Sequence, residues 1–240
     1  MEPRRKLSPE EQAERDKEKF LLDFNSQYRN AVAEIPEKFR WVDQKIQPNS
    51  QSRLPLEEQA KLYKEITSKE KRLEGWAFFA PAGYGKTTAS WLLYKYAIRE
   101  NIAHALWNGK MEFTGGDSRT VLPYWPCYCW HIVLPEYLQQ IQASWNDESV
   151  VRPKLIFDKF EKAKQDGFRP RLFLEEIDKI KEGSEWANNT LFTLFNAVDK
   201  HKAQLVFDTN LSKQQFMNRF GEPIARRVKE NCNVREWGFQ

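Results

Sequence analysis

The sequence has few cysteines and no long apolar run. Its 240 residues include three cysteines, Cys127, Cys129 and Cys232. A C-x-C pair without a second pair nearby lacks the usual spacing of a zinc site, so we expect buried or free thiols. Sparse cysteine is typical of a reducing compartment. No apolar run approaches the roughly 18 to 20 residues of a membrane span. We therefore expect a cytoplasmic protein without a membrane partner.

The sequence also lacks a large excess of either charge. There are 38 Lys and Arg against 34 Asp and Glu, a formal net charge of +4. This balance permits contact with nucleic acid without requiring it. A hydrophobic content of 40% is compatible with a globular protein of one substantial core plus an appendage.

Residues 1–74 have the pattern of a helical extension. Ser8, Pro9 and Glu11 form a capping box with proline at the first helical position, which predicts a helix from near Pro9. Two apolar stripes follow at helical spacing, made of Leu21, Phe24, Tyr28 and Val32, and of Leu56, Ala60, Tyr63 and Ile66. Basic and acidic residues nearly balance here, so the extension is not a basic arm for nucleic acid. It either binds a protein partner or packs on the core.

Residues 75–240 alternate short apolar runs with helical stretches, which is typical of an α/β domain with a mostly parallel sheet. The predicted strands cover residues 76–79, 103–107, 129–133, 171–174 and 204–207, with a possible last strand at 233–237. The predicted helices cover residues 87–99, 135–144, 153–165 and 185–200. We therefore expect a five-stranded, mostly parallel sheet preceded by the helical extension.

The segment 108–128 interrupts this alternation and reads as a hairpin or loop insertion. It mixes aromatic residues with Lys110 and Arg119. Such a mixture could stack on and neutralise single-stranded nucleic acid. Packing explains the aromatic residues equally well, and both interpretations stay open.

A phosphate-binding loop is predicted between the first strand and the helix after it. Its residues are Pro81, Ala82, Gly83, Tyr84, Gly85, Lys86, Thr87 and Thr88. Glycines let main-chain amides surround a phosphate, the lysine adds a full charge, and Thr87 offers a hydroxyl to Mg²⁺. Ala80 replaces the usual first glycine, which a residue with negative φ can do without strain. The alternative, a surface lysine beside an ordinary turn, does not account for the strand-loop-helix order. We expect ATP and Mg²⁺ to bind here.

Two acids follow the strand at 171–174, at the edge of the sheet where ligands of α/β proteins bind. Glu175 is predicted to help hold Mg²⁺ and Glu176 to polarise the water that attacks the γ-phosphate. Asn210, after the next strand, is the candidate group that orients this water or senses the phosphate. Without the phosphate loop, each would be an ordinary polar residue at a strand end.

Two arginines near the end of the sequence suggest assembly. Arg226 and Arg227 follow Pro223, which could open a helix. A guanidinium group supplied by a neighbouring subunit stabilises charge on a transferring phosphoryl group, which couples hydrolysis to oligomerisation. The alternative is a pair of surface arginines.

Together these motifs resemble the AAA+ ATPases of the DnaC/IstB type, which are bacterial helicase loaders and helper ATPases of transposition. Residues 35–40, IPEKFR, are similar to the family's I-P-x-x-[FY]-[RK] element near the nucleotide base. Glu175-Glu176-Ile177 stands where the family has D-E-[IL], and Thr209-Asn210 where it has [ST]-N. Residues 221–228, GEPIARRV, are similar to its G-[DE]-x-x-x-[SD]-R-[LIM] element. The resemblance implies a three-layer domain without a large C-terminal lid, with Arg227 as the finger acting in trans and Arg226 as the second choice.

The departures from the family pattern are Ala80, Glu175 and the insertion. Ala80 and Glu175 imply slow turnover of ATP. Because of the insertion, the family's DNA-contacting positions cannot be assigned to residues of this sequence. The resemblance implies a homo-oligomeric ATPase that acts on DNA. Its partner would be a replicative helicase or, alternatively, a transposase recruited to a filament on duplex DNA. A small-molecule P-loop kinase is a more distant alternative, because it would need neither DNA nor an arginine in trans.

Overall fold

Five strands form one sheet in the order β2-β3-β4-β1-β5, and each pairing between described strands is parallel. The computed structural model describes residues 8–33, 35–40, 50–107, 128–146 and 156–239. The strands are β1 (Gly75–Phe79), β2 (Cys129–Val133), β3 (Arg171–Glu175), β4 (Gln204–Thr209) and β5 (Cys232–Glu236). Because the strands are parallel, their carboxyl ends share one edge of the sheet, where ligand sites of α/β folds form.

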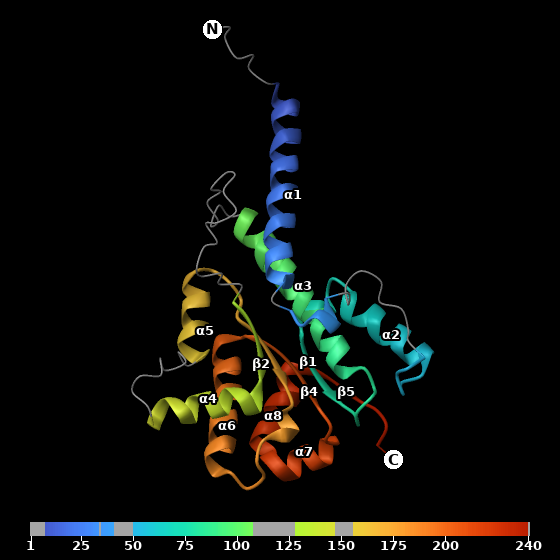
Figure 1. Ribbon diagram of the computed structural model, residues 1–240, viewed down its shortest axis with the longest axis vertical. Helices are drawn as coiled ribbons and strands as arrows, with labels where there is room; N and C mark the ends of the chain where they lie inside the picture. Colours follow the sequence, from blue (N-terminus) through green and yellow to red (C-terminus); the bar gives the residue numbers. More distant parts are fainter. Residues whose placement is uncertain (1–7, 34, 41–49, 108–127, 147–155, 240) are drawn as a thin grey trace.

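Helices cover both faces of the sheet and make three layers (Figure 1). One face packs against α4 (Leu134–Asn146), α5 (Ile156–Gln165), α6 (Glu185–His201), α7 (Lys213–Phe220) and α8 (Glu222–Asn231). The other packs against α3 (Lys86–Trp107), α2 (Leu56–Thr67) and the second half of α1 (Pro9–Ala33). Short 3-10 turns lie at η1 (Glu37–Phe39), η2 (Lys71–Leu73) and η3 (Ile177–Lys179).

The two faces follow from the alternation of side chains along each strand. In β1, Ala77 and Phe79 join the cluster with α4 to α8, whereas Trp76 and Phe78 join the cluster with α3. These side chains are buried, as the short apolar runs of a central parallel strand predict. The predicted strands at 76–79, 129–133, 171–174 and 204–207 are confirmed, and the possible strand near the end of the sequence is present as β5.

The predicted strand at residues 103–107 is wrong. Ala103–Trp107 forms the end of α3, which continues unbroken from Lys86. The buried residues Ile98, Ile102 and Ala105 recur at helical steps, so the apolar run continues the helix. The predicted insertion therefore lies between α3 and β2, and its residues 108–127 are outside the described part of the chain.

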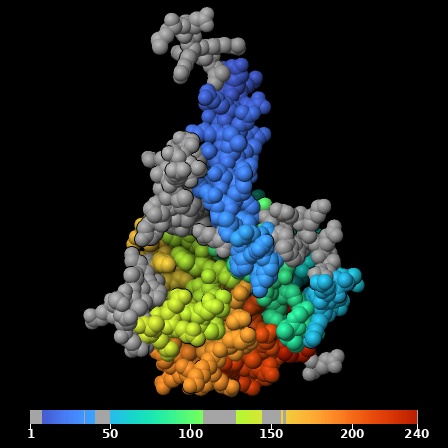
Figure 2. Space-filling model, viewed as in Figure 1, coloured from blue at the N-terminus to red at the C-terminus, as the bar shows by residue number. Residues whose placement is uncertain are grey.

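The first helix begins where its capping box predicts. The backbone amide of Ser8 donates to Glu11 Oε2 at 2.8 Å, and the amide of Glu11 donates to Ser8 Oγ at 3.1 Å. Phe24, Tyr28 and Val32 of the predicted stripe pack against the α3 cluster, but Leu21 is 48% exposed. The first half of α1 projects away from the sheet and its helices (Figure 1, Figure 2). Three of the four residues of the predicted stripe are therefore covered.

The second helix buries a different stripe from the predicted one. The buried residues of α2 are Gln59, Leu62 and Ile66, whereas Leu56 and Ala60 are exposed. Ile66 was predicted correctly, and Tyr63 packs partly buried against the same cluster, whereas Leu56 and Ala60 were wrong. Gln59 is buried instead, and its side chain donates to the carbonyl of Leu54. Leu62 and Ile66 pack in the same cluster as β1 and α3, so α2 belongs to the core of the domain.

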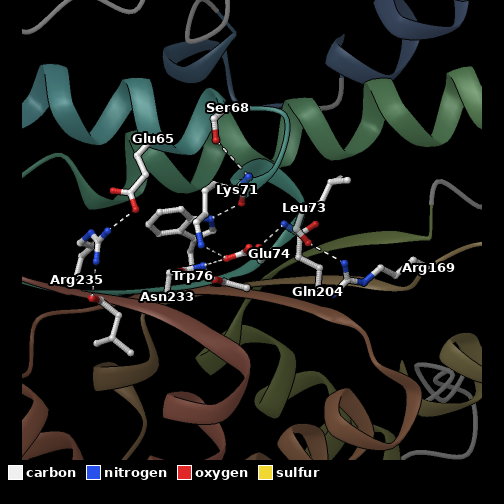
Figure 3. Close-up of polar contacts among 12 residues, drawn as sticks. Glu65, Ser68, Lys71, Leu73, Glu74, Trp76, Arg169, Gln204, Asn233 and Arg235 are labelled. Atoms are coloured by element: carbon white, nitrogen blue, oxygen red, sulfur yellow. Dashed lines mark hydrogen bonds and ion pairs between the residues drawn. The ribbon is translucent and has the colours of Figure 1, made fainter.

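The connector from α2 to β1 is held against the amino ends of β4 and β5 by polar side chains (Figure 3). Gln204 Nε2 donates to the carbonyls of Arg72 and Glu74 at 3.0 and 2.7 Å. Asn233 Nδ2 donates to Glu74 Oε2 at 2.5 Å. These contacts close the amino edge of the sheet. Within the residues that the structure describes, no helix has the length and apolar character to cross a membrane.

Candidate functional site

The predicted phosphate loop lies between β1 and α3, at the carboxyl edge of the sheet. The amide of Ala80 donates to the carbonyl of Thr209 at 3.2 Å and extends the β1–β4 ladder, and its φ is not positive. Gly83 and Gly85 have φ of 89° and 78°, a region that other residues enter only with strain. The helix then begins at Lys86, so free amides of its first turn face the loop. The arrangement suits a bound phosphate.

The loop is supported from the side of α2. The amide of Arg53 donates to the carbonyl of Gly83 at 2.8 Å. The side chain of Arg53 also lies against Gly83, and Ser52 and Tyr63 lie near Gly85. These contacts between the segment before β1 and the loop were not predicted from the sequence.

Lys86 reaches from the first turn of α3 across the loop. Its Nζ donates to the carbonyl of Pro81 at 2.9 Å and to Asn210 Oδ1 at 3.0 Å. Burial lowers the pKa of Lys86, and the carboxylates of Asp208 and Asp178 partly offset this. A phosphate would supply the negative charge that this buried ammonium group lacks.

Thr87 pairs with an acid that the sequence analysis did not select. Thr87 Oγ1 donates to Asp208 Oδ2 at 2.8 Å, and Asp208 is 5% exposed. Burial raises the pKa of the Asp208 carboxyl to about 6, and the nearby Glu175 acts in the same direction, while Thr87 and Lys86 oppose it. A hydroxyl and a carboxylate oxygen are the hard donors that Mg²⁺ prefers, so these residues fit a magnesium ion.

The two predicted acids at the end of β3 point to different places. Glu176 adopts a left-handed conformation with φ of 59° and lines the cavity beside the loop, with Oε1 at 3.5 Å from Lys179 Nζ. Such a conformation is uncommon outside glycine and often marks a functional position. Glu175 Oε1 instead lies 3.3 Å from His131 Nε2 on β2. These two buried atoms are close enough to pair but are not aligned for a hydrogen bond, and neither has another hydrogen-bond partner among the described residues.

Asn210 links the phosphate loop to the turn after β3. Its Oδ1 accepts from Lys86, and its Nδ2 donates to Asp178 Oδ2 at 2.9 Å. Asp178 Oδ1 also accepts from the amide of Asn210 at 3.0 Å. The side chain of Asn210 is therefore fixed by an acid that the sequence analysis did not assign.

These groups surround an open cavity of about 300 Å³. It is lined by Ala82, Gly83, Gly85, Lys86, Thr87, Thr88, Glu176, Asp178, Lys179, Asp208 and Asn210. The fold thus brings together most of the predicted nucleotide-binding residues with Glu176 and Asn210. Pro81, Tyr84 and Glu175 are nearby in the fold but do not line the cavity. The roles of all these residues stay predictions.

The candidate finger arginines lie on α8 and do not line the cavity. Arg227 is folded back: NH1 donates to the carbonyl of Pro223 at 3.0 Å, and its guanidinium lies 4.9 Å from the centre of the Phe192 ring. Arg226 is exposed, with Nε 3.8 Å from Glu230 Oε1. Within one subunit, Arg226 is thus the freer of the two to reach a neighbour.

The acids at 178 and 208 had recognisable signals in the sequence. Asp208 directly follows the apolar run 205–207 and stands two residues before Asn210. Asp178 stands two residues after Glu176. Both carboxylates therefore had to fall near the same edge of a parallel sheet. The contacts from the segment before β1 had no such local signal.

The fold is similar to those of solved replication proteins. AMPPCP-bound DnaA from Aquifex aeolicus matches with a TM-score of 0.50 and 10% sequence identity, over 80% of this chain and 48% of that one. The DnaC helicase loader matches with a TM-score of 0.50 and 13% identity, over 83% of this chain and 98% of that one. This chain thus spans about half of the DnaA chain. No protein-family model matches the sequence, and no curated protein matches it. At these identities the likeness concerns the fold alone: the chain has an α/β fold that matches AAA+ domains, like the folds of DnaC and DnaA.

Proposed function

We propose that the chain is an ATP-dependent AAA+ switch that oligomerises on DNA and loads a DNA-bound partner, a replicative helicase. The observation that carries this proposal is the cavity at the carboxyl edge of the sheet. It combines the first turn of α3, the buried Lys86 and three acids with a polar amide at Asn210. That combination suits a triphosphate better than any uncharged ligand.

Each group has a role that its position supports. Lys86 would neutralise phosphate charge, and Thr87 with its acid partner Asp208 would hold a magnesium ion, whose chemistry there would be that of a Lewis acid. Glu176 and Asn210 line the cavity, which supports the proposal that Glu176 polarises water and Asn210 orients it. Arg226 or Arg227 would complete the site of a neighbouring subunit.

The helicase partner is proposed from two features. The DnaC neighbour is a helicase loader, and the match extends over 98% of its chain. The first half of α1 has no buried residue and projects beyond the domain (Figure 2), so it is available to a partner. A transposition helper would use the same site, and no contact among the described residues separately favours it.

Fluorescence anisotropy tests the coupling of nucleotide and DNA. Labelled single-stranded and duplex oligonucleotides are titrated with the full chain, with and without a slowly hydrolysed ATP analogue and Mg²⁺. We expect nucleotide-dependent binding with a preference for single strands, weakening with salt. Lys86→Ala should lose the nucleotide dependence. Duplex preference would favour the transposition helper, and binding indifferent to nucleotide would contradict a switch.

Subunit mixing tests the arginine in trans. An Arg226→Ala or Arg227→Ala chain is mixed with a Lys86→Ala chain, so that one interface can still combine an intact loop with an intact arginine. We expect ATP hydrolysis to recover partly for the variant that removes the finger. A lack of recovery for both arginine variants, with folded proteins, would remove this part of the proposal.

A further inference from the structure

Asp208 lies at the centre of the sheet, directly beneath the phosphate loop. It belongs to β4, between β1 and β3, and pairs in register with Phe78 of β1. Since β1 leads into the loop, a short side chain on β4 at this level is close enough to reach the first turn of α3.

The alternation along β4 directs Asp208 toward α3. Leu205 and Phe207 pack in the cluster with α6 to α8, and Val206 packs in the cluster with α3. Asp208, two residues after Val206, faces the same side. Its hydrogen bond with Thr87 at 2.8 Å follows from this placement. It is only 5% exposed where it lines the cavity, so little solvent competes for that contact.

Glu175 faces the same side of the sheet but lies beside His131 of β2. Phe173, two residues before it, packs in the α3 cluster, as does Cys129, two residues before His131. Glu175 and His131 therefore meet on this face, with Oε1 and Nε2 at 3.3 Å. The contacts found among the described residues include none between Glu175 and Thr87.

We propose that Asp208 on β4, and not Glu175 on β3, is the carboxylate that holds Thr87 and positions the magnesium ion of the bound nucleotide. This inference rests on the proposed nucleotide-binding function. Asp208, a shorter acid on the neighbouring strand β4, supplies the negative charge beside Thr87, while the longer side chain of Glu175 lies against His131. Asp208 is a positioning residue, because it acts on the ion through Thr87 and the water around it.

The test compares two charge-removing variants of nearly unchanged shape, Asp208→Asn and Glu175→Gln. A fluorescent ADP analogue is titrated into the full chain with excess Mg²⁺ and with EDTA, and the ratio of the two Kd values measures the magnesium dependence. The amide in Asp208→Asn keeps an oxygen acceptor for Thr87, so a purely structural role would leave the ratio unchanged. We expect the ratio to fall about tenfold to a hundredfold in Asp208→Asn and to be unchanged in Glu175→Gln.

The second readout is metal binding itself. Mn²⁺ is added to each nucleotide-bound variant, and its binding is followed by electron paramagnetic resonance. Asp208→Asn should weaken Mn²⁺ binding, whereas Glu175→Gln should match the wild type. Thermal unfolding without nucleotide controls for folding. If Asp208→Asn does not fold, Glu175→Gln decides alone: retained magnesium dependence supports the proposal, and its loss overturns it.

The outcomes separate this inference from the proposed function. Wild-type chain that binds no nucleotide in either buffer would remove the proposed function and the inference with it. Nucleotide binding whose magnesium dependence is lost in Glu175→Gln, or is intact in Asp208→Asn, would overturn the inference alone. Equal loss in both variants would also overturn it, because Glu175 would then share the role.

Discussion

The two edges of the same sheet both carry buried charges, but they use them differently. At the amino edge, Arg171 donates to Glu100 Oε2 at 3.0 Å and to Gln204 Oε1 at 3.2 Å, and Arg72 donates to Glu100 Oε1 at 2.7 Å. At the carboxyl edge, Lys86 and Asp208 line an open cavity. The amino edge is closed by the α2–β1 connector (Figure 3), and the carboxyl edge is open to a ligand.

This difference indicates whether a buried charge affects folding stability or ligand binding. A charge whose partners are all within the protein contributes to folding, and its loss leaves the partner buried and unpaired. A charge that lines a cavity lowers folded stability by its own burial and is compensated when a ligand of opposite sign binds. Mutations at the amino edge should therefore change stability, and mutations at the carboxyl edge should change ligand affinity.

The largest effect is expected for Lys86→Ala at the carboxyl edge. Loss of the ammonium group should weaken nucleotide binding by about 4 kcal/mol, roughly a thousandfold, while the free energy of unfolding changes little. Isothermal titration calorimetry with Mg²⁺-nucleotide measures the affinity, and chemical denaturation measures the stability. Lys179→Ala is the matched control, since Lys179 also lines the cavity but its side chain is 57% exposed. An equal loss in both variants would contradict a specific role for Lys86.

The opposite pattern is expected for Arg171→Met at the amino edge. The Arg171 side chain is 7% exposed, so its removal should lower the free energy of unfolding by about 3 kcal/mol, measured by urea denaturation, and leave nucleotide affinity unchanged. Glu100 keeps Arg72 as a partner, so adding Glu100→Gln should give a total loss smaller than the sum of the two single losses, because both variants remove the same Arg171–Glu100 contact. Lys61→Met breaks an exposed pair and should leave stability nearly unchanged. If Arg171→Met left stability unchanged and weakened nucleotide binding, the proposed difference between the two edges would be contradicted.

The two edges also differ in how much of each could be predicted from the sequence: more of the carboxyl edge than of the amino edge. The carboxyl edge is local in sequence: Gly83, Lys86 and Thr87 form one motif, and Glu176 and Asn210 each follow an apolar strand. Parallel strands then bring these ends together. At the amino edge, Gln204 contacts the carbonyl of Arg72 and Arg171 contacts Glu100. These partners are far apart in the chain and follow no spacing rule, so the packed structure was needed to find them.

The errors of prediction have the same origin. Ala103–Trp107 was assigned to a strand because a short apolar run fits a strand and a buried helix equally well. Glu175 was assigned to magnesium because it follows β3, and this role stays a prediction; its neighbour His131, with Nε2 at 3.3 Å from Glu175 Oε1, was not foreseen. Asp208 was visible as an acid after a strand, but its partner Thr87 became apparent only from the register of β4 with β1.

A smaller effect is expected for Asp178→Asn, which tests how the carboxyl edge orients Asn210. An amide in place of the carboxylate would set one NH₂ group against another, so the side chain of Asn210 would lose its fixed orientation. We expect ATP hydrolysis to fall about tenfold with nucleotide affinity nearly unchanged. The double variant with Asn210→Ala should be no slower than Asn210→Ala alone, because Asp178 acts through Asn210. Additive losses in steady-state hydrolysis would show that Asp178 has a separate role.

The smallest effect is expected at His201, which ends α6 near the amino edge. Burial lowers the pKa of His201, and Lys200 and Lys164 act in the same direction, while Glu161, with Oε2 at 3.7 Å from Nδ1, opposes them. The unfolded chain then binds a proton at a higher pH than the folded chain does. Stability from this group is complete above the ordinary histidine pKa and is lost as pH falls below it. Urea denaturation between about pH 7.5 and pH 5.5 should show a shallower decline for His201→Asn than for the wild type, with nucleotide affinity at neutral pH equal in both. A steeper decline in the variant would mean that the folded state favours the protonated ring and that Glu161 outweighs burial at this edge.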